Sequence, residues 1–459
     1  MKTRWTSTSK PTHLLTTCLG LLLTGAVTAG NWPAWRGPEG TGVSTEKNLP
    51  LHWSTNENVR WRTPLPERGN STPIVWGRRV FVTQAVEQRR TLMCFDRTNG
   101  KLLWQQGPTY AKQESTHETN PLGSSSPVTD GERIIAWFGS AGLSCFDLDG
   151  KELWHRDLGP QRHVWGWGSS PMLHGDLCVL NFGPGVPSFL LAVNKRTGRT
   201  TWQMDELNAD PGEKKPGQDK PSWVGSWSTP IVINTGSRTE LVLSWPKRVV
   251  AFEPASGKEL WTCAGLNPLA YTSPLYDKNE KIVVAMGGFM GMSLAVRAGG
   301  AGDVTESRRL WHHPKTKQRI GSGVIGDGHI YILNDPGVAE CFELNTGKLV
   351  WEERLKGPAA KSDNWSSLVL AGDRLYAINQ GGDAFVLRAS PKFETLATNS
   401  IGEMTIASMA MSDDELFIRT HQALWCIGGS RTLTARFSRL NSSFTWARYT
   451  SRTRSANLT

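Results

Sequence analysis

Apolar and polar positions along this chain repeat in units of short segments, without the three-to-four-residue period of helices. Each unit starts with Ser or Thr, usually followed by Pro, and a short apolar segment. Two segments of alternating apolar and polar residues come next, and the unit closes with a glycine turn and a fourth segment that ends in Trp. The clearest example of the closing part of a unit, from the end of the third segment to the final Trp, runs from Phe95 to Trp104. Alternation over a few residues between turn signals is typical of half-buried strands, so each unit predicts a four-stranded sheet.

The turn before the last strand is the most regular feature. Five copies place a glycine four residues before the closing tryptophan, at Gly100, Gly150, Gly198, Gly257 and Gly347. Glycine readily adopts the positive φ of a tight hairpin turn. We therefore expect each closing Trp to lie on the outermost strand of its unit, where its flat indole covers the turn of a neighbouring unit.

The first strands give an independent count of eight units. Their hydroxyl residues, five of them followed by Pro, are Thr72, Ser126, Ser170, Thr229, Ser273, Ser322, Ser367 and Ser408. The eighth unit lacks a closing strand, whereas residues 59–64 resemble an outer strand with no inner strands before it. Pairing the two removes an exposed sheet edge. The sequence therefore predicts an all-β, eight-bladed β-propeller of four-stranded blades over residues 30–430, closed by its N-terminal strand.

Residues 1–29 have the pattern of a secretory signal peptide. Lys2, Arg4 and Lys10 precede a mostly apolar stretch over residues 14–27, and small residues at positions 27–29 form a cleavage site. The apolar stretch is too short to span a bilayer. We therefore expect a periplasmic or secreted protein with no transmembrane segment after signal cleavage.

The formal net charge of +10 is concentrated at the two ends of the chain. Three positive charges lie in the leader and six arginines lie in residues 431–459, which leaves about +1 for residues 31–430. A nearly neutral body has no broad basic face, so we expect no nucleic-acid partner. Residues 431–459 are expected to form a basic, disordered tail, and the protein is expected to be a monomer.

The repeats resemble those of pyrroloquinoline-quinone-like (PQQ-like) propellers, the family that contains quinoprotein alcohol dehydrogenases and the outer-membrane assembly lipoprotein of the β-barrel machinery. The stretch from Trp32 to Pro38, followed by Gly42-Val43-Ser44, resembles the N-terminal signature of secreted propellers frequent in planctomycete-type bacteria. The resemblance covers about residues 31–430. It is specific for the fold and much less specific for an activity.

The resemblance implies a test for a quinone cofactor. In quinoprotein dehydrogenases of this family, the quinone typically lies between a disulfide of two adjacent cysteines and a tryptophan, with calcium bound by acidic and amide side chains. This sequence has no adjacent cysteine pair and no cytochrome Cys-x-x-Cys-His motif. We therefore expect no cofactor, and PQQ with calcium remains the alternative.

The cysteines themselves favour free thiols. Four of them occupy the same place on the third strand of their units, at Cys94, Cys145, Cys341 and Cys426. A repeated position of this kind predicts small buried side chains between blades, too far apart for disulfides.

The candidate site is the rim of the central channel, because residues just before each strand start should gather there. The aromatic, amide and charged residues at these positions are Asn70, His117, Glu118, Asn120, Trp165, Trp167, Trp227, Tyr271, Arg319, Asn364 and Trp365. Stacking faces combined with orienting hydrogen-bond groups suit a planar or sugar-like ligand. Alternatively, the aromatic residues plug the channel and fill gaps between blades.

The sequence contains no nucleophile elbow and no phosphate-binding loop. His117 and Glu118 have the chemistry of an acid–base pair, but one histidine and one carboxylate on a loop are common, so we assign no catalytic or metal residue. The leading hypothesis is an exported non-catalytic propeller that binds a protein partner or cell-envelope ligand at its channel rim. The alternatives are a periplasmic PQQ-dependent oxidoreductase of alcohols or sugars, and a glycan-binding module.

Overall fold

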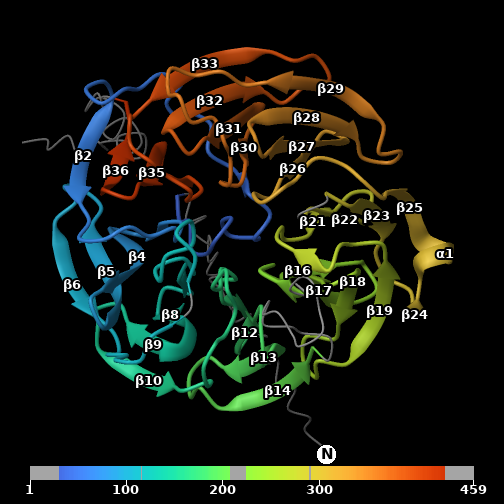
Figure 1. Ribbon diagram of the computed structural model, residues 1–459, viewed down its shortest axis with the longest axis horizontal. Helices are drawn as coiled ribbons and strands as arrows, with labels where there is room; N and C mark the ends of the chain where they lie inside the picture. Colours follow the sequence, from blue (N-terminus) through green and yellow to red (C-terminus); the bar gives the residue numbers. More distant parts are fainter. Residues whose placement is uncertain (1–29, 115, 207–223, 289–290, 430–459) are drawn as a thin grey trace, which may run out of the picture.

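The computed structural model describes residues 30–114, 116–206, 224–288 and 291–429, which form eight blades arranged in a ring, each a β-sheet of four or five strands, and one further two-stranded sheet (Figure 1). The first strand of each sheet faces the central channel and the last lies at the periphery. The prediction of an all-β, eight-bladed propeller is confirmed. The predicted signal peptide and basic tail lie outside the described residues. No helix in the described part of the chain is long and apolar enough to cross a membrane.

The first four blades follow one another in chain order. Blade 1 contains β3 (Ile74–Trp76), β4 (Arg79–Val86), β5 (Arg89–Asp96) and β6 (Leu102–Gln106). Blade 2 contains β7 (Val128–Thr129), β8 (Arg133–Trp137), β9 (Leu143–Asp147) and β10 (Glu152–Arg156). Blade 3 contains β11 (Met172–His174), β12 (Leu177–Phe182), β13 (Phe189–Asn194) and β14 (Thr200–Asp205). Blade 4 contains β16 (Ile231–Asn234), β17 (Thr239–Trp245), β18 (Arg248–Phe252) and β19 (Glu259–Ala264).

The second half continues the ring. Blade 5 contains β21 (Leu275–Asp277), β22 (Ile282–Met286), β23 (Ser293–Arg297) and β25 (Arg309–His313). Blade 6 contains β26 (Val324–Gly326), β27 (His329–Asn334), β28 (Val338–Glu343) and β29 (Leu349–Arg354). Blade 7 contains β30 (Val369–Ala371), β31 (Arg374–Ile378), β32 (Asp383–Arg388) and β33 (Thr395–Ser400). Blade 8 contains β34 (Ala410–Ser412), β35 (Glu415–Arg419), β36 (Ala423–Ile427) and β2 (Val59–Pro64).

Six short elements lie outside this pattern. They are β1 (Val43–Ser44), β15 (Gly225–Ser226), β20 (Leu269–Ala270), β24 (Gly302–Asp303), the 3-10 turn η1 (Gly139–Ala141) and α1 (Thr305–Arg308). β24 and α1 lie in a segment inserted between β23 and β25, the last two strands of blade 5. β24 pairs in parallel with β19 and so extends the outer edge of blade 4.

The N-terminal strand closes the ring as predicted. β2 pairs antiparallel with β36, with Trp61 opposite Cys426. Across the seam, the Arg97 guanidinium of blade 1 lies 2.9 Å from carboxylate oxygens of both Asp413 and Glu415 in blade 8. The last blade therefore has no unpaired third strand, and ion pairs as well as strand pairing hold the seam.

Five outer tryptophans each join one blade to the next, as the glycine–tryptophan spacing predicts. The Trp61 indole lies against Gly100 of blade 1 and donates its Nε1–H to the Arg97 carbonyl at 2.7 Å. The same arrangement joins Trp104, Trp154, Trp202 and Trp311 to Gly150, Gly198, Gly257 and Gly347. Each such contact buries a large aromatic surface and satisfies its single polar atom.

Blade 4 departs from this arrangement for a structural reason. The insertion in blade 5 replaces the glycine turn that Trp261 would cover. Trp261 is fully buried and donates its indole N–H to the Glu240 carboxylate at 2.8 Å instead. A buried indole N–H left without an acceptor would cost about 1–3 kcal/mol, so the insertion comes with a substitute acceptor.

The hydroxyl residues at the strand starts form a second set of contacts between blades, which we call the hydroxyl ring (Thr72, Ser126, Ser170, Thr229, Ser273, Ser322, Ser367 and Ser408). Each backbone N–H from Thr72 to Ser367 donates to the side-chain oxygen of the next member, at 2.8–3.0 Å. This explains why blades 6 to 8 keep the hydroxyl although they lack the proline. Seven of the junctions around the channel are thus hydrogen-bonded at the same place.

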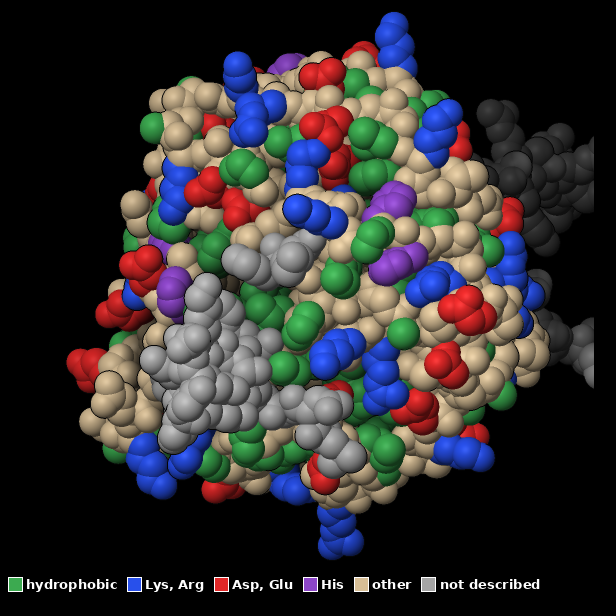
Figure 2. All heavy atoms as spheres, turned by 45° about the vertical axis from the view of Figure 1, so that its right-hand side comes forward, with side chains coloured by type: hydrophobic (Ala, Val, Ile, Leu, Met, Phe, Trp, Pro, Cys, Tyr) green, Lys and Arg blue, Asp and Glu red, His purple; other side chains and the backbone are tan. Residues whose placement is uncertain are grey.

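The core lies between the blades and consists of apolar side chains from facing sheets. Ile74 and Phe81 of blade 1, for example, pack in one cluster with Ile134 and Phe146 of blade 2. The six described cysteines are buried and form no disulfide with one another. On the surface, Lys and Arg side chains alternate with Asp and Glu over the face shown in Figure 2, without a single-sign patch among the described residues in view.

Candidate functional site

A cavity of about 310 Å³ lies at the mouth of the channel, and residues that precede the first strands of all eight blades line it together with Trp35 of the N-terminal segment. Five lining residues are aromatic, three carry amides, six carry hydroxyls, and the others are His117, Gly168, Ile320 and Ile406. The first three groups are Trp35, Trp165, Trp227, Tyr271 and Trp365; Asn70, Asn120 and Gln318; and Thr72, Thr119, Ser124, Ser170, Ser367 and Ser408. None of the described lining residues is Asp, Glu, Lys or Arg.

One wall of the cavity is an aromatic arc formed by Trp165, Trp227 and Tyr271, which precede the first strands of blades 3, 4 and 5. The ring centroids of Trp165 and Trp227 are 6.1 Å apart, and Tyr271 meets Trp227 edge-on at 5.0 Å. Burial raises the pKa of the Tyr271 hydroxyl well above its usual value, so Tyr271 is a neutral phenol at physiological pH. The arc therefore presents uncharged stacking faces.

Hydrogen bonds to the backbone hold the arc in place. The Asn120 amide nitrogen donates to the carbonyls of Trp165 and Trp167, at 2.6 and 2.9 Å. The Trp227 indole N–H donates to the Gly166 carbonyl at 3.1 Å. Because these donors come from neighbouring blades, the orientation of the aromatic rings is coupled to the blade arrangement.

The N-terminal segment closes the channel beneath the cavity. Trp32 pairs with Val75 in blade 1, while the Arg36 guanidinium reaches the carbonyls of Gly323 and Leu368 in blades 6 and 7. Residues 32–36 thus cross the ring, whose centre the blue segment occupies in Figure 1. Val75, Gly323 and Leu368 each follow the hydroxyl-ring residue of their blade, so they lie farther from the channel mouth than that ring. Trp35, which lies in the segment that contacts them, therefore forms the floor of the cavity.

Arg36 fixes this crossing segment. It is fully buried and also donates to the Ser322 and Thr41 carbonyls. Burial lowers the pKa of the Arg36 guanidinium to about 9, so Arg36 remains charged at neutral pH. Main-chain carbonyl dipoles rather than a carboxylate compensate the charge.

The rim of the cavity carries polar groups with satisfied partners. His421 Nε2 lies 3.2 Å from Asn70 Oδ1, and burial followed by the charge of Arg419 lowers the pKa of His421 to about 4. On the far side, Gln318 Nε2 donates to Asp335 Oδ2 at 3.1 Å. Burial and the charge of Asp363 raise the pKa of the Asp335 carboxyl above its usual range.

The structure brings seven of the eleven residues proposed from the sequence into the cavity lining. They are Asn70, His117, Asn120, Trp165, Trp227, Tyr271 and Trp365. Their role as ligand contacts remains a prediction.

The other four lie elsewhere. Trp167 packs against Trp137 inside the core between blades 2 and 3. Arg319 is buried in an ion pair with Glu340 at 2.8 Å. Asn364 is buried and donates to the Ser366 carbonyl at 3.0 Å, and Glu118 is exposed.

Sequence reasoning missed Trp35 and the lining hydroxyls. Four of the six lining hydroxyls were visible as strand-start markers, and extending the proposed rim to the strand start itself would have included them: Thr72, Ser170, Ser367 and Ser408. Gln318 could have been found in the same way, because it directly precedes Arg319. Trp35 had no such signal, since its place depends on a segment that belongs to no repeat.

The lining chemistry does not fit PQQ with calcium. The quinone carries three carboxylates, and calcium prefers carboxylate and amide oxygens, but the described lining offers no cation and no carboxylate. No group of three or more His, Cys, Asp or Glu suited to a metal occurs among the described residues. His117 Nδ1 contacts only the nearby Thr119 hydroxyl, at 2.8 Å, and no carboxylate in the described chain hydrogen-bonds to His117.

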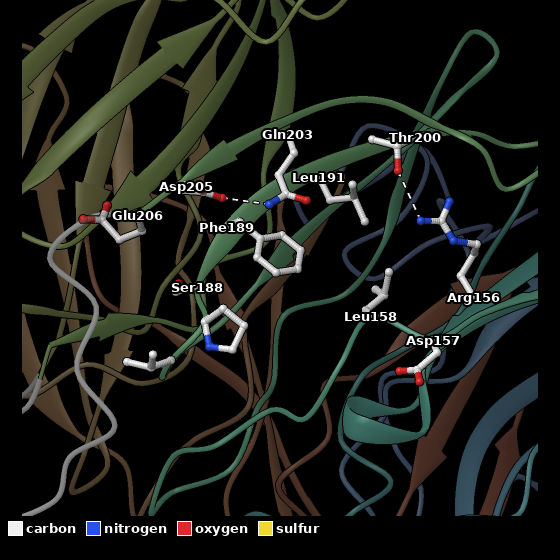
Figure 3. Close-up of a pocket in the computed structure, with 12 residues that line it drawn as sticks. Arg156, Asp157, Leu158, Ser188, Phe189, Leu191, Thr200, Gln203, Asp205 and Glu206 are labelled. Atoms are coloured by element: carbon white, nitrogen blue, oxygen red, sulfur yellow. Dashed lines mark hydrogen bonds between the residues drawn. The ribbon is translucent and has the colours of Figure 1, made fainter.

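A second cavity, of about 620 Å³, lies on the flank between blades 2 and 3 (Figure 3). Its polar side chains bond one another: Gln203 donates to Asp205 at 2.8 Å, and Arg156 donates to Thr200 at 3.2 Å. It lies away from the channel axis, where residues of many blades converge. We therefore take the channel-mouth cavity as the candidate site.

Comparisons with known proteins agree on the fold. A family model described as outer membrane protein assembly factor BamB matches residues 2–182 and 188–447. BamB from Moraxella catarrhalis is 12% identical, with 81% of this chain and 97% of that chain covered and a TM-score of 0.55. A europium-containing methanol dehydrogenase is 12% identical, with 84% of this chain and 89% of that chain covered and a TM-score of 0.59.

A quinohemoprotein alcohol dehydrogenase from Comamonas testosteroni is also 12% identical, with 89% of this chain and 82% of that chain covered and a TM-score of 0.59. Among curated proteins, none matches the chain. Likeness at such identities concerns the fold alone, and the fold is shared by an assembly factor and by dehydrogenases.

Proposed function

The chain belongs to the family described as outer membrane protein assembly factor BamB, and on that premise we propose that it is an exported, non-catalytic propeller that binds a cell-envelope component in its channel-mouth cavity. The observation that carries this proposal is the cavity itself, which is closed below by Trp35 and lined by aromatic rings, amides and hydroxyls. Convergent polar groups in a largely aromatic cavity are typical of ligand sites. The cell compartment follows from the proposed leader and is periplasmic or extracellular.

The absence of a reactive pair in the lining favours binding over catalysis. General acid–base or nucleophilic chemistry requires a titratable group within hydrogen-bond reach of a second group that orients it. In the described lining, His117 has only a contact within its own turn, to Thr119. The lining hydroxyls of Ser170, Ser367 and Ser408 accept backbone N–H groups and have no described base beside them.

Site-specific photo-crosslinking in the native host tests the binding proposal. A photoreactive amino acid replaces Glu118, which is exposed beside the cavity, and in a matched control it replaces Lys258, which is exposed in a turn of blade 4. We expect a discrete product from position 118 only, lost when Trp227→Ala is added. Equal products at both positions, or a product that Trp227→Ala does not change, would contradict binding in the cavity.

The dehydrogenase alternative has its own test. The purified chain is mixed with PQQ and calcium, and dye-linked oxidation of primary alcohols and aldose sugars is followed. We expect no turnover and no quinone absorbance retained by the protein after gel filtration. Turnover above the protein-free control would overturn the non-catalytic assignment.

A further inference from the structure

We propose that the ligand of the channel-mouth cavity is a neutral sugar, bound through one or two rings at the end of an envelope glycan. The inference rests on the proposed function, because it names the class of ligand for the same cavity. It is carried by three features of the described residues: the stacking faces, the arrangement of hydrogen-bond donors and acceptors, and the lack of charge.

The cavity offers indole faces on which a sugar ring can pack. Trp165 and Trp227 are inclined by 36° to each other across 6.1 Å, and both are only partly buried. Trp365 lines the cavity from blade 7, three blades beyond Trp227 around the ring. The C–H face of a pyranose packs on such indoles, while its hydroxyls remain at the ring edge for hydrogen bonds.

The hydroxyl ring supplies donors at the deeper end of the cavity. Ser170, Ser367 and Ser408 each accept a backbone N–H from the preceding member, at 2.9–3.0 Å. No hydrogen bond among the described residues uses their own O–H groups as donors. Each of these hydroxyls therefore has a hydrogen to donate to a ligand oxygen.

Two amide oxygens supply acceptors. The Asn120 nitrogen donates to two main-chain carbonyls, and the Gln318 nitrogen donates to Asp335, so in both residues the amide oxygen is the group left for a ligand. Sugar hydroxyls donate and accept, and they match both sets. An aromatic or proline side chain of a partner protein would match the stacking faces alone and would leave these polar groups unsatisfied, at about 1–3 kcal/mol each.

The charge pattern selects a neutral ligand. A carboxylate or phosphate entering the cavity would lose hydration without meeting a cation in the described lining. The buried cations nearby are engaged elsewhere: Arg36 binds carbonyls of blades 6 and 7, and Arg419 binds the Thr83 carbonyl at 2.7 Å and Gln84 Oε1 at 2.7 Å. A volume of about 310 Å³ suits the end of a glycan rather than a long stretch of it.

Titration of the purified full chain with a small panel tests the proposal. The probes are three neutral trisaccharides (maltotriose, cellotriose and chitotriose), the anionic trigalacturonate, and the blocked peptide Pro-Phe-Pro. Binding is measured by tryptophan fluorescence and by saturation-transfer NMR. We expect at least one neutral trisaccharide to bind, with affinity about tenfold lower or worse in Trp227→Ala and largely retained in Trp227→Phe, since the second variant keeps a stacking face.

Two further variants separate site effects from folding effects. Gln318→Leu removes an acceptor together with the hydrogen bond to Asp335, and is expected to weaken sugar binding about fivefold or more with only a small fall in the thermal midpoint. Trp351→Phe, in the outer strand of blade 6, alters a partly buried indole away from the cavity and is expected to leave affinity unchanged. Equal effects of Trp351→Phe and Gln318→Leu would overturn the proposal.

The failure of this inference can be told apart from the failure of the proposed function. Binding of the peptide but of no sugar, with the same dependence on Trp227, overturns the sugar assignment and leaves a binding cavity. Preference for trigalacturonate over all neutral sugars overturns the neutral class in the same way. If no probe binds but the crosslink at position 118 persists, only the sugar assignment is overturned. If no probe binds and the crosslink is also lost, the sugar assignment and the proposed function are both overturned.

Discussion

At the residue scale, the turn glycines have two separate functions in this propeller. Gly100 has a φ of +72°, which non-glycine residues rarely adopt, and a Cβ added there would lie 2.5 Å from the Trp61 ring. Gly77 has a φ of +55°, but no atom lies within 4 Å of its added Cβ. Alanine at Gly77 therefore introduces backbone strain alone, whereas alanine at Gly100 introduces backbone strain and also displaces the Trp61 indole.

We predict that Gly100→Ala lowers the free energy of unfolding by about 2–4 kcal/mol, because backbone strain adds to displacement of the indole. Gly77→Ala should cost about 1–2 kcal/mol, from the backbone conformation alone. Denaturant unfolding followed by tryptophan fluorescence measures both. Equal losses in the two variants would contradict the interlocking role of the glycine–tryptophan contact.

His421 couples the rim of the cavity to pH. Burial, then the charges of Arg419, Arg68 and Lys361, lower its native-state pKa to about 4, against about 6.5 in an unfolded chain. Between these values the unfolded chain binds a proton that the native chain does not, so the free energy of unfolding falls as pH falls through this window.

The unfolding free energy of the native protein falls between pH 7 and pH 4.5. We predict that this fall is smaller by about 1 kcal/mol in His421→Gln, which keeps a donor toward Asn70 but cannot take up the proton; the figure allows for solvent screening. Urea unfolding at the two pH values gives the comparison. If the pH-dependent loss is the same in both proteins, His421 does not titrate as the structure implies.

At the scale of elements, the N-terminal segment has more contacts than its length suggests. It provides the closing strand β2, the parallel strand β1 beside β30, the cavity floor at Trp35 and the buried Arg36. Without it, β36 would expose an unpaired edge and the channel would be open beneath the cavity.

We predict that deleting residues 31–64 causes aggregation or a fall of more than about 10 °C in the thermal midpoint, since strand pairing, Trp61 and the crossing segment are lost together. Trp61→Ala in the full chain is the control, expected to cost about 3–5 kcal/mol while keeping the closed ring. A truncated protein that melts like the full chain would refute closure by β2.

At the scale of the whole molecule, closure makes every blade an internal one. In open repeat arrays the terminal repeats have one neighbour and unfold first. Here each blade has two neighbours, and the apolar core at each junction is supplemented by an outer tryptophan, by a hydrogen bond of the hydroxyl ring, or by both. The six described cysteines are buried in six different blades, so they report on whether the ring opens as a unit.

We predict that these thiols react with a thiol reagent slowly and at one common rate in the native protein, and rapidly in denaturant. Burial raises the pKa values of Cys94, Cys145 and Cys341 to about 12, so almost no thiolate is present at pH 8. Mass spectrometry after partial labelling resolves each site. Much faster labelling of one blade would show that the ring opens locally.

The sequence by itself determined the blade count, the closing strand and the tryptophan contacts between blades. These features are encoded within one repeat or between adjacent repeats, and a repeat interacts almost only with its neighbours, so regular spacing such as Gly100 to Trp104 is enough to predict them.

Tertiary structure alone decided which rim residues meet in the cavity. The side chains of adjacent residues at the rim have different surroundings: Gln318 lines the cavity, whereas Arg319 is buried in an ion pair with Glu340. Trp35 reaches the cavity only because its segment crosses the ring between blades that are distant in sequence. The orientation of a loop side chain and the path of a non-repeating segment depend on packing against many blades at once, which no local spacing records.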